Sequence, residues 1–283
     1  SLRGELFQRN EDDSPYASVK VESIADAINE NADVKALKQS FVDAFAGFED
    51  MLHDHLITNV MSVNEMKEQD AIAEEIFRRL QSIALVDKYT AYQALADNWQ
   101  TIVNDIETIQ TDGMEAVRAV EQAYKIKKDG DDEVEVPDGL KGRILPFELV
   151  QSVKFQSELD AIAQMQAEVD ECVSNLEDAP NNFTEEETTV YLEDGDSPKL
   201  NKKKITSDAK TKGDSIEPET KAKLKEIVAL WDKQSKTNKA IKVAKADLES
   251  KTIDTIQNLT DVEVDEFLHL KWVTPIYDAI KQT

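Results

Sequence analysis

The residues of this chain that could do chemistry are few and poorly spaced for it. His53 and His55 lie two residues apart in a helical pattern, so they point to different faces of a helix. They cannot grip one metal ion as residues at i and i+4 would, and we expect ordinary surface or boundary histidines. The single cysteine, Cys172, lies on an apolar stripe with no histidine nearby in sequence. This favours a buried, inert thiol over a nucleophile.

Other candidate ligand groups also point away from a metal or cofactor site. Asp129, Asp131 and Asp132 could suggest calcium, but the twelve-residue loop that ends in a bidentate glutamate is missing, which favours a solvated turn. One cysteine excludes an internal disulfide framework and a cysteine-based zinc cluster, and it is typical of a reducing cytosol. We therefore expect no catalytic, cofactor-binding or metal-binding residue in this chain.

A lysine cluster is the remaining candidate for direct ligand binding. Five net positive charges fall within fourteen residues, where they could contact a nucleic-acid backbone. A flexible connector that is kept soluble by its charge is the competing interpretation. The cluster consists of Lys199, Lys202, Lys203, Lys204, Lys210 and Lys212.

Charge is divided unevenly along the 283 residues, whose net charge is −25. Residues 1–198 carry 16 Lys and Arg against 44 Asp and Glu, whereas residues 199–283 carry 17 against 14. The acidic front would be repelled by the phosphates of duplex DNA. No apolar run approaches membrane-spanning length and no signal pattern opens the chain, so we expect no membrane contact. Because Ser1-Leu2-Arg3-Gly4 lacks an initiator methionine, we expect a fragment of a longer protein.

The elements that carry these residues are predicted to be mainly α-helical. Apolar stripes over residues 34–56, 72–83 and 89–106 predict three core-facing helices, and we place them in a helical region, residues 1–112. Short alternation between Val117 and Val136 predicts a small β insertion within residues 113–145.

Residues 146–283 are predicted to form a long antiparallel, coiled-coil-like helical hairpin. One long helix starts at Pro146 and stops near Ala179-Pro180, and a second starts after Pro218. Between them, residues 181–218 are predicted to be a polar, lysine-rich loop. Short helices end the chain, the first opened by the capping-box spacing Thr260-Asp261-Val262-Glu263.

Two helices alone leave apolar surface uncovered, so their stripes are candidate partner-docking surfaces. The candidate docking residues are Phe155, Leu159, Ile162, Val169, Val173, Leu176, Leu224, Val228, Trp231, Ile241, Leu248, Leu259 and Trp272.

Three stretches resemble one known family. The first stretch is Leu85-Val86-Asp87-Lys88-Tyr89-Thr90-Ala91-Tyr92-Gln93, which continues to Trp99 and is similar to a Leu-Leu/Ile-Asp-x-Tyr-x-x-Tyr-x-x-Leu…Trp pattern of that family. Ile144-Leu145-Pro146-Phe147-Glu148-Leu149-Val150 is similar to the start of that family's first long helix. The third stretch spans Leu230 to Trp272 and is similar to the family's second long helix, its following helix start, seen here as Leu259-Thr260-Asp261-Val262-Glu263, and its Lys-Trp ending, seen here as Lys271-Trp272. In this order and spacing, over residues 85–283, they resemble the C-terminal region of the modification (DNA methyltransferase) subunit of type I restriction-modification systems. Phe147 and Ile256-Gln257-Asn258 depart from the family pattern, which puts the subfamily in doubt.

The resemblance implies a prokaryotic, cytoplasmic assembly part of an enzyme. The catalytic half that it implies would bind S-adenosylmethionine and methylate adenine N6 in duplex DNA. The long helices would pack on the helical spacers of the specificity subunit, in a complex with a second modification subunit and the restriction subunit. DNA would be reached through that complex.

This chain lacks the parts that such a methyl transfer needs. It has no glycine-rich strand-to-helix turn, since Gly139 and Gly142 lack a flanking apolar strand, and it has no Pro-Pro pair for an Asn/Asp-Pro-Pro-aromatic motif. We therefore expect no catalysis by this chain and no cofactor in it. Two alternatives stay open, a nucleic-acid-binding helical module that uses the lysine cluster and a free-standing helical adaptor unrelated to methylation.

Overall fold

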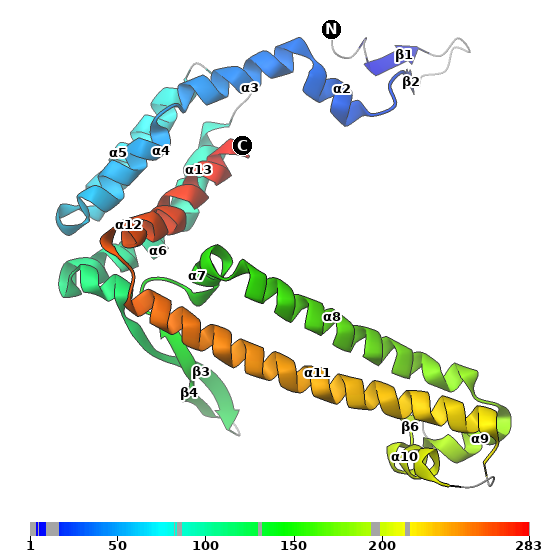
Figure 1. Ribbon diagram of the computed structural model, residues 1–283. Helices are drawn as coiled ribbons and strands as arrows, with labels where there is room; N and C mark the ends of the chain where they lie inside the picture. The colour runs from blue at the N-terminus through cyan, green and yellow to red at the C-terminus, as the bar shows by residue number, and fades with distance from the viewer. Residues whose placement is uncertain are drawn as a thin grey trace. The chain divides into compact units, whose positions relative to one another are not determined.

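The computed structural model describes residues 4, 6–9, 17–81, 83, 87–129, 132–193, 199–212 and 216–282 (Figure 1). The predicted turns around Gly130 and Asp194-Gly195-Asp196, and Leu85-Val86 of the first family-like stretch, lie outside these residues. The prediction of a mainly α fold with a small β insertion and a long helical hairpin is confirmed. Three two-stranded antiparallel sheets accompany the helices in the described part of the chain.

The chain divides into two compact units, Ser1–Leu145 with Asn258–Thr283 and Pro146–Gln257. This grouping differs from our predicted regions, because both residues 113–145 and the end of the chain belong to the first unit. The residues after the second long helix belong to the first unit because their apolar side chains are buried in its core. Trp272, Ile276 and Ile280 are completely buried, and the helix that contains the last two packs against residues 88–112.

The first unit is built from many short elements and two longer helices. Its elements before the β insertion are β1 (Phe7–Arg9), β2 (Ala17–Val19), α2 (Ile24–Glu30), α3 (Ala32–Ala44), α4 (Phe48–His53), the π-helix η1 (Asp54–Thr58), the 3-10 helix η2 (Val60–Ser62), α5 (Glu65–Leu80) and α6 (Lys88–Asp112). Its remaining elements are the 3-10 helix η3 (Met114–Arg118), β3 (Val120–Asp129), β4 (Asp132–Gly142), α12 (Asp261–Leu268), the π-helix η5 (His269–Val273) and α13 (Thr274–Lys281).

The predicted single helix over residues 34–56 is wrong, because the chain turns between α3 and α4. Gly47 there has φ 68°, a left-handed conformation that favours glycine. α3 buries none of its residues, whereas Phe48 and Leu52 of α4 are completely buried. The residues that face the core are therefore confined to the C-terminal half of the predicted helix.

The β insertion is a long two-stranded ribbon, with β3 antiparallel to β4. Its pairing shifts between Gln122 and Tyr124, opposite Gly139, whose φ of 82° allows the irregularity. Tyr124 and Ile126 are about two-thirds exposed, so the ribbon adds little to the core.

A cluster of nearly buried polar contacts joins α6 to η5 in the first unit, and we call these contacts of Asp105, Lys271 and Trp272 the Asp105 clamp. Asp105 of α6 accepts hydrogen bonds from Lys271 Nζ at 2.5 Å and from Trp272 Nε1 at 2.8 Å. Lys271 Nζ also donates to the Ile144 carbonyl at 2.5 Å. Because Asp105 and Lys271 are both nearly buried, each charge depends on the other for its stability.

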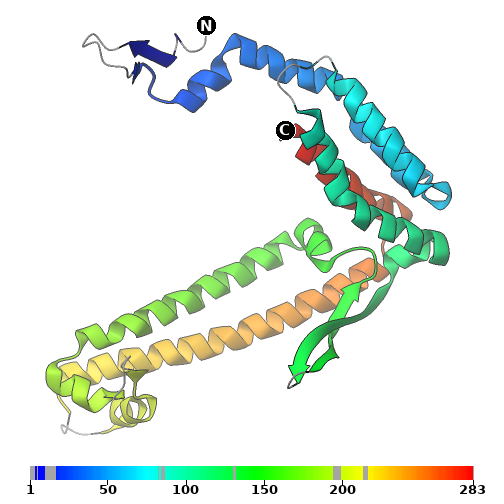
Figure 2. The ribbon, with the colours of Figure 1, turned by 180° about the vertical axis from the view of Figure 1, so that it is seen from behind.

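The second unit is a helical hairpin with a folded tip. Its elements are α7 (Phe147–Lys154), α8 (Gln156–Asp178), the 3-10 helix η4 (Ala179–Asn182), α9 (Glu185–Tyr191), β5 (Leu192–Glu193), β6 (Lys199–Leu200), α10 (Lys202–Lys210) and α11 (Pro218–Gln257). α8 and α11 lie side by side and antiparallel in both views (Figures 1 and 2).

Two predictions about this unit are wrong in part. The first long helix is interrupted at Phe155, whose φ of −132° and ψ of 33° separate α7 from α8. The predicted polar loop of residues 181–218 contains two helices and a short β pair. Its folding has a local cause, because Thr184 and Glu187 form a capping box on α9 and Asn201 caps α10.

Candidate docking surface

The apolar stripe between α8 and α11 is only partly covered. Val169 of α8 and Ile241 and Leu248 of α11 are buried along the hairpin, and Leu224 of α11 is buried in a cluster near its tip. The other predicted docking residues of the hairpin, Phe155, Leu159, Ile162, Val173, Leu176, Val228 and Trp231, are half-buried. A pair of helices covers the centre of each stripe and leaves its margins open, whereas a bundle would cover them too.

Two predicted docking residues are not on the hairpin. Leu259 and Trp272 belong to the first unit, where Leu259 is buried and Trp272 is completely buried. Trp272 is held by its hydrogen bond to Asp105, and the Leu259 carbonyl accepts a hydrogen bond from Arg118 at 2.7 Å. Their roles are structural, so the docking prediction is wrong for this pair.

A groove of about 400 Å³ opens on one flank of the hairpin near its tip. Its apolar lining comes from Val173, Leu176, Pro180, Leu200 and Trp231. Polar side chains at its edge include Glu177, Lys199 and Lys202, and the Lys202 ammonium lies 5.2 Å from the Trp231 ring centroid. An aromatic floor with charged edges suits an apolar anchor residue from a partner.

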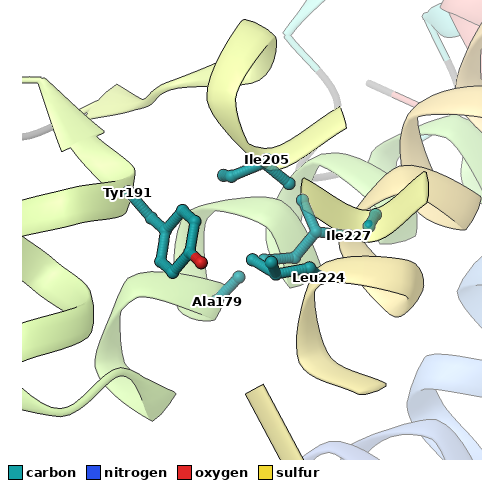
Figure 3. Close-up of a cluster of buried hydrophobic side chains, with 6 residues drawn as sticks. Ala179, Tyr191, Ile205, Leu224 and Ile227 are labelled. Atoms are coloured by element: carbon teal, nitrogen blue, oxygen red, sulfur yellow. The ribbon is translucent and has the colours of Figure 1, made fainter. Parts of the chain in front are cut away.

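The tip holds this groove in place through a small core of its own (Figure 3). Ile205 of α10 and Leu224 of α11 are completely buried there, beside Tyr191 of α9. The Tyr191 hydroxyl donates to Asp208 at 3.2 Å. Burial, together with the Asp208 charge, raises the pKa of Tyr191. The hydroxyl therefore stays protonated and able to donate.

Glu187 ties α9 to the start of α11. It accepts hydrogen bonds from Thr220 Oγ1 at 2.6 Å and from Lys223 Nζ at 3.3 Å. Burial alone would raise the pKa of Glu187, but these bonds and the Thr184 backbone N–H lower it. The ionised Glu187 carboxylate thus joins α9, which lies between the two long helices in sequence, to α11.

The lysine cluster is carried by this folded tip. Lys204 pairs with Asp208 at 3.0 Å, and Lys202 lies over Trp231. Lys199, Lys203, Lys210 and Lys212 have exposed side chains, and no ion pair is found for them within the described ranges. Three lysines in the first turn of α10 oppose the helix dipole, and the contacts of Lys202 with Trp231 and of Lys204 with Asp208 offset this cost for two of them.

The residues considered for metal or nucleophile chemistry have structural partners. His53 Nε2 lies 2.9 Å from Asp265, and His55 Nδ1 lies 2.7 Å from Glu68. Cys172 is buried in α8. Within the described part of the chain there is no group of three or more side chains placed to hold a metal ion. Asp131 lies outside that part.

Several residues of the family-like stretches hold the fold together. Asp87 caps α6, Ile144 and Leu145 are buried, and Thr260 forms a capping box with Glu263. Sequence reasoning missed the Asp105 clamp because its partners lie more than 160 residues away. It also missed the tip core, whose apolar residues are scattered among charged ones.

Comparisons with known protein families, curated proteins and solved structures find no match for this chain. Among the helices described here, none combines the length and apolar character needed to cross a membrane.

Proposed function

We propose that this chain is the assembly region of a type I restriction-modification DNA methyltransferase subunit, in the cytoplasm of a prokaryote. The hairpin of α8 and α11 docks the long helices of the specificity subunit. The chain does no chemistry itself, and the parent protein supplies the S-adenosylmethionine-dependent methylation of adenine N6.

The half-buried seam is the observation that carries this proposal. Leu159, Ile162 and Trp231 keep apolar surface open beside a well-formed helix pair, and additional helices could cover that surface. The family-like stretches at residues 87–93, 144–150 and 259–272 support the choice of family.

Co-purification with the specificity subunit encoded beside this chain tests the proposal. An Ile162→Asp variant should bind that subunit at least tenfold more weakly, because a carboxylate would be buried in an apolar contact. A matched control is Val42→Asp, since Val42 of α3 is exposed in the other unit. Failure of the folded wild-type chain to bind the folded specificity subunit would end the proposal.

The exposed lysines of the tip favour a second candidate function, a nucleic-acid-binding module. Changing Lys199, Lys203, Lys210 and Lys212 to Gln should then abolish a gel shift of duplex DNA. Wild-type binding should weaken steeply across a salt series, since phosphate contacts release counterions. A free-standing adaptor is the remaining alternative, and a gene with no upstream methyltransferase domain would favour it.

A further inference from the structure

The ribbon of β3 and β4 has little support from the rest of the first unit. Among the described strands, β3 pairs only with β4, and the two form a sheet of their own. In both views the ribbon extends away from the helices of the first unit (Figures 1 and 2). Most of its described side chains are exposed, including those of Tyr124 and Ile126. A sheet of two strands is marginally stable in water, and a third strand would stabilise it.

The two open edges of the ribbon differ in their capacity to accept another strand. Each strand of a two-stranded sheet has one edge whose backbone N–H and C=O groups lack a strand partner. β4 contains Pro137, which has no N–H to donate, so its row of backbone donors is interrupted. β3 contains no proline over Val120–Asp129. The open edge of β3 is therefore the edge that is suited to pair with a third strand.

β3 also has free positive charge beside this edge. The charged residues within residues 122–128 are all lysines, Lys125, Lys127 and Lys128. Lys125 forms an ion pair with Asp138 of β4 at 2.5 Å. Lys127 and Lys128 are exposed, and in the part of the chain that the structure describes no ion pair is found for either of them. Their ammonium groups are therefore available to the carboxylates of an added strand.

The alternation of residues along β3 specifies the chemistry of that strand. Successive residues of a strand point to opposite faces of the sheet. Tyr124, Ile126 and Lys128 thus share one face, and Lys125 and Lys127 share the other. An added strand would place apolar side chains beside Tyr124 and Ile126, and acidic side chains beside the lysines. Apolar pairs and pairs of opposite charge between neighbouring strands both stabilise a sheet.

We propose that the open edge of β3 binds an extended acidic segment of another protein, in which apolar and acidic residues alternate. The segment adds a third strand to the ribbon, and its backbone pairs with the free N–H and C=O groups of β3. The hairpin of α8 and α11 takes no part in this contact. The proposal therefore stands or falls separately from the proposed docking function.

Other occupants fit this edge less well. A second copy of β3 would set lysines against lysines, and like charges on neighbouring strands destabilise a sheet. β4 of a second copy is acidic, but Pro137 interrupts its backbone donors. A two-stranded ribbon can enter the major groove of duplex DNA. Here the carboxylates of Glu133, Glu135 and Asp138 on β4 would be repelled by the phosphates.

Binding of synthetic peptides to the full chain, measured by fluorescence anisotropy, tests the proposal. The probe is a peptide of about ten residues that alternates valine and glutamate, since this length is that of a long strand. We expect saturable binding that weakens as the salt concentration rises. Amide hydrogen exchange over residues 121–128 should slow at least fivefold when the peptide is bound. A peptide that alternates valine and lysine should bind at least tenfold more weakly.

Backbone methylation distinguishes strand addition from simple charge attraction. In an added strand, alternate residues direct their N–H groups toward β3 and the others direct them toward solvent. Two versions of the acidic peptide, each N-methylated on one of the two alternate sets, have the same charge. One version should bind as the unmethylated peptide does, and the other at least tenfold more weakly, because its hydrogen bonds to β3 are lost. Equal binding of the two versions would overturn the proposal.

Reversal of the two free lysines tests the charge on the side of the protein. Lys127→Glu with Lys128→Glu should weaken binding of the acidic peptide at least tenfold. Lys67→Glu with Lys233→Glu is the matched control, since both lysines are exposed outside the ribbon and the change in net charge is equal. The control should bind the peptide as the wild-type chain does.

Two further results would overturn the proposal. One is failure of the acidic peptide to bind the wild-type chain, which would leave the lysines of β3 as protection of an exposed edge. The other is equal binding by the wild-type chain and the Lys127→Glu, Lys128→Glu variant. Amide exchange of the free variant shows whether its ribbon is still formed. If the ribbon is lost, the methylated peptides on the wild-type chain decide.

Discussion

At the scale of single residues, Asp105 is a nearly buried carboxylate that holds both Lys271 and Trp272. Replacement of Asp105 by Ala would leave the Lys271 ammonium nearly buried without its counter-charge. We expect the free energy of unfolding to fall by about 3 kcal/mol, measured by urea denaturation. Asp97→Ala on the exposed side of α6 is the control and should change stability by less than about 0.5 kcal/mol. Equal losses in both variants would contradict a special role for the clamp.

Glu75 gives a prediction for pH at the same scale. Hydrogen bonds from Arg78, opposed by burial and assisted by Arg79, lower the pKa of Glu75 from 4.5 to about 2. A depressed pKa in the folded state adds stability above pH 4.5, and this stability is lost as the pH falls toward 2. Glu75→Gln should therefore be less stable than wild type by about 1 kcal/mol at pH 7. The two unfolding curves should converge in acid, and a constant difference would refute the assignment.

At the scale of elements, the capping box of Thr184 and Glu187 stabilises α9 in the segment between the two long helices. Thr184→Ala removes the side-chain acceptor for the Glu187 N–H, so α9 should lose about 1 kcal/mol of local stability. Hydrogen exchange over residues 185–193 should accelerate roughly fivefold. Thr184→Ser should restore slow exchange, whereas Thr189→Ala, inside the same helix and exposed, serves as the control. Unchanged exchange in Thr184→Ala would show that tertiary packing alone orders this segment.

The elements that sequence reasoning predicted correctly are those with a strong local signal. The stripes of α6 and α11 repeat over many turns, and Pro180 and Thr260 mark helix boundaries that the structure confirms. The helices between α8 and α11 escaped prediction because Tyr191, Ile205 and Ala209 form no periodic stripe of their own. They are buried through contacts with one another and with residues of α8 and α11. Along α8 the predicted docking residues Leu159, Ile162, Val173 and Leu176 are half-buried, and their role in docking stays a prediction. Leu259 and Trp272 were misplaced, because periodicity shows that a residue faces a core without showing which core.

At the scale of the whole molecule, the end of the chain completes the first unit. A chain truncated after Gln257 should retain the hairpin unit, whose contacts lie within Pro146–Gln257. The first unit would lose Phe267, Trp272 and Ile276 from its core and should unfold or bind a hydrophobic dye. Limited proteolysis is the measurement, with protection expected for the hairpin and cleavage for the first unit. Full protection of both would contradict the division into these units.

The clamp of Lys271 and Trp272 on Asp105 also has a consequence for the order of events during synthesis. Residues 1–145 leave the ribosome before the hairpin unit, yet part of their core arrives only with residues 258–283, after that unit. The hairpin unit can be complete by then, since everything it needs has already emerged. The half-finished first unit must therefore wait through the synthesis of the whole hairpin with apolar surface exposed. That interval is when this chain would be most open to chaperones and to premature degradation.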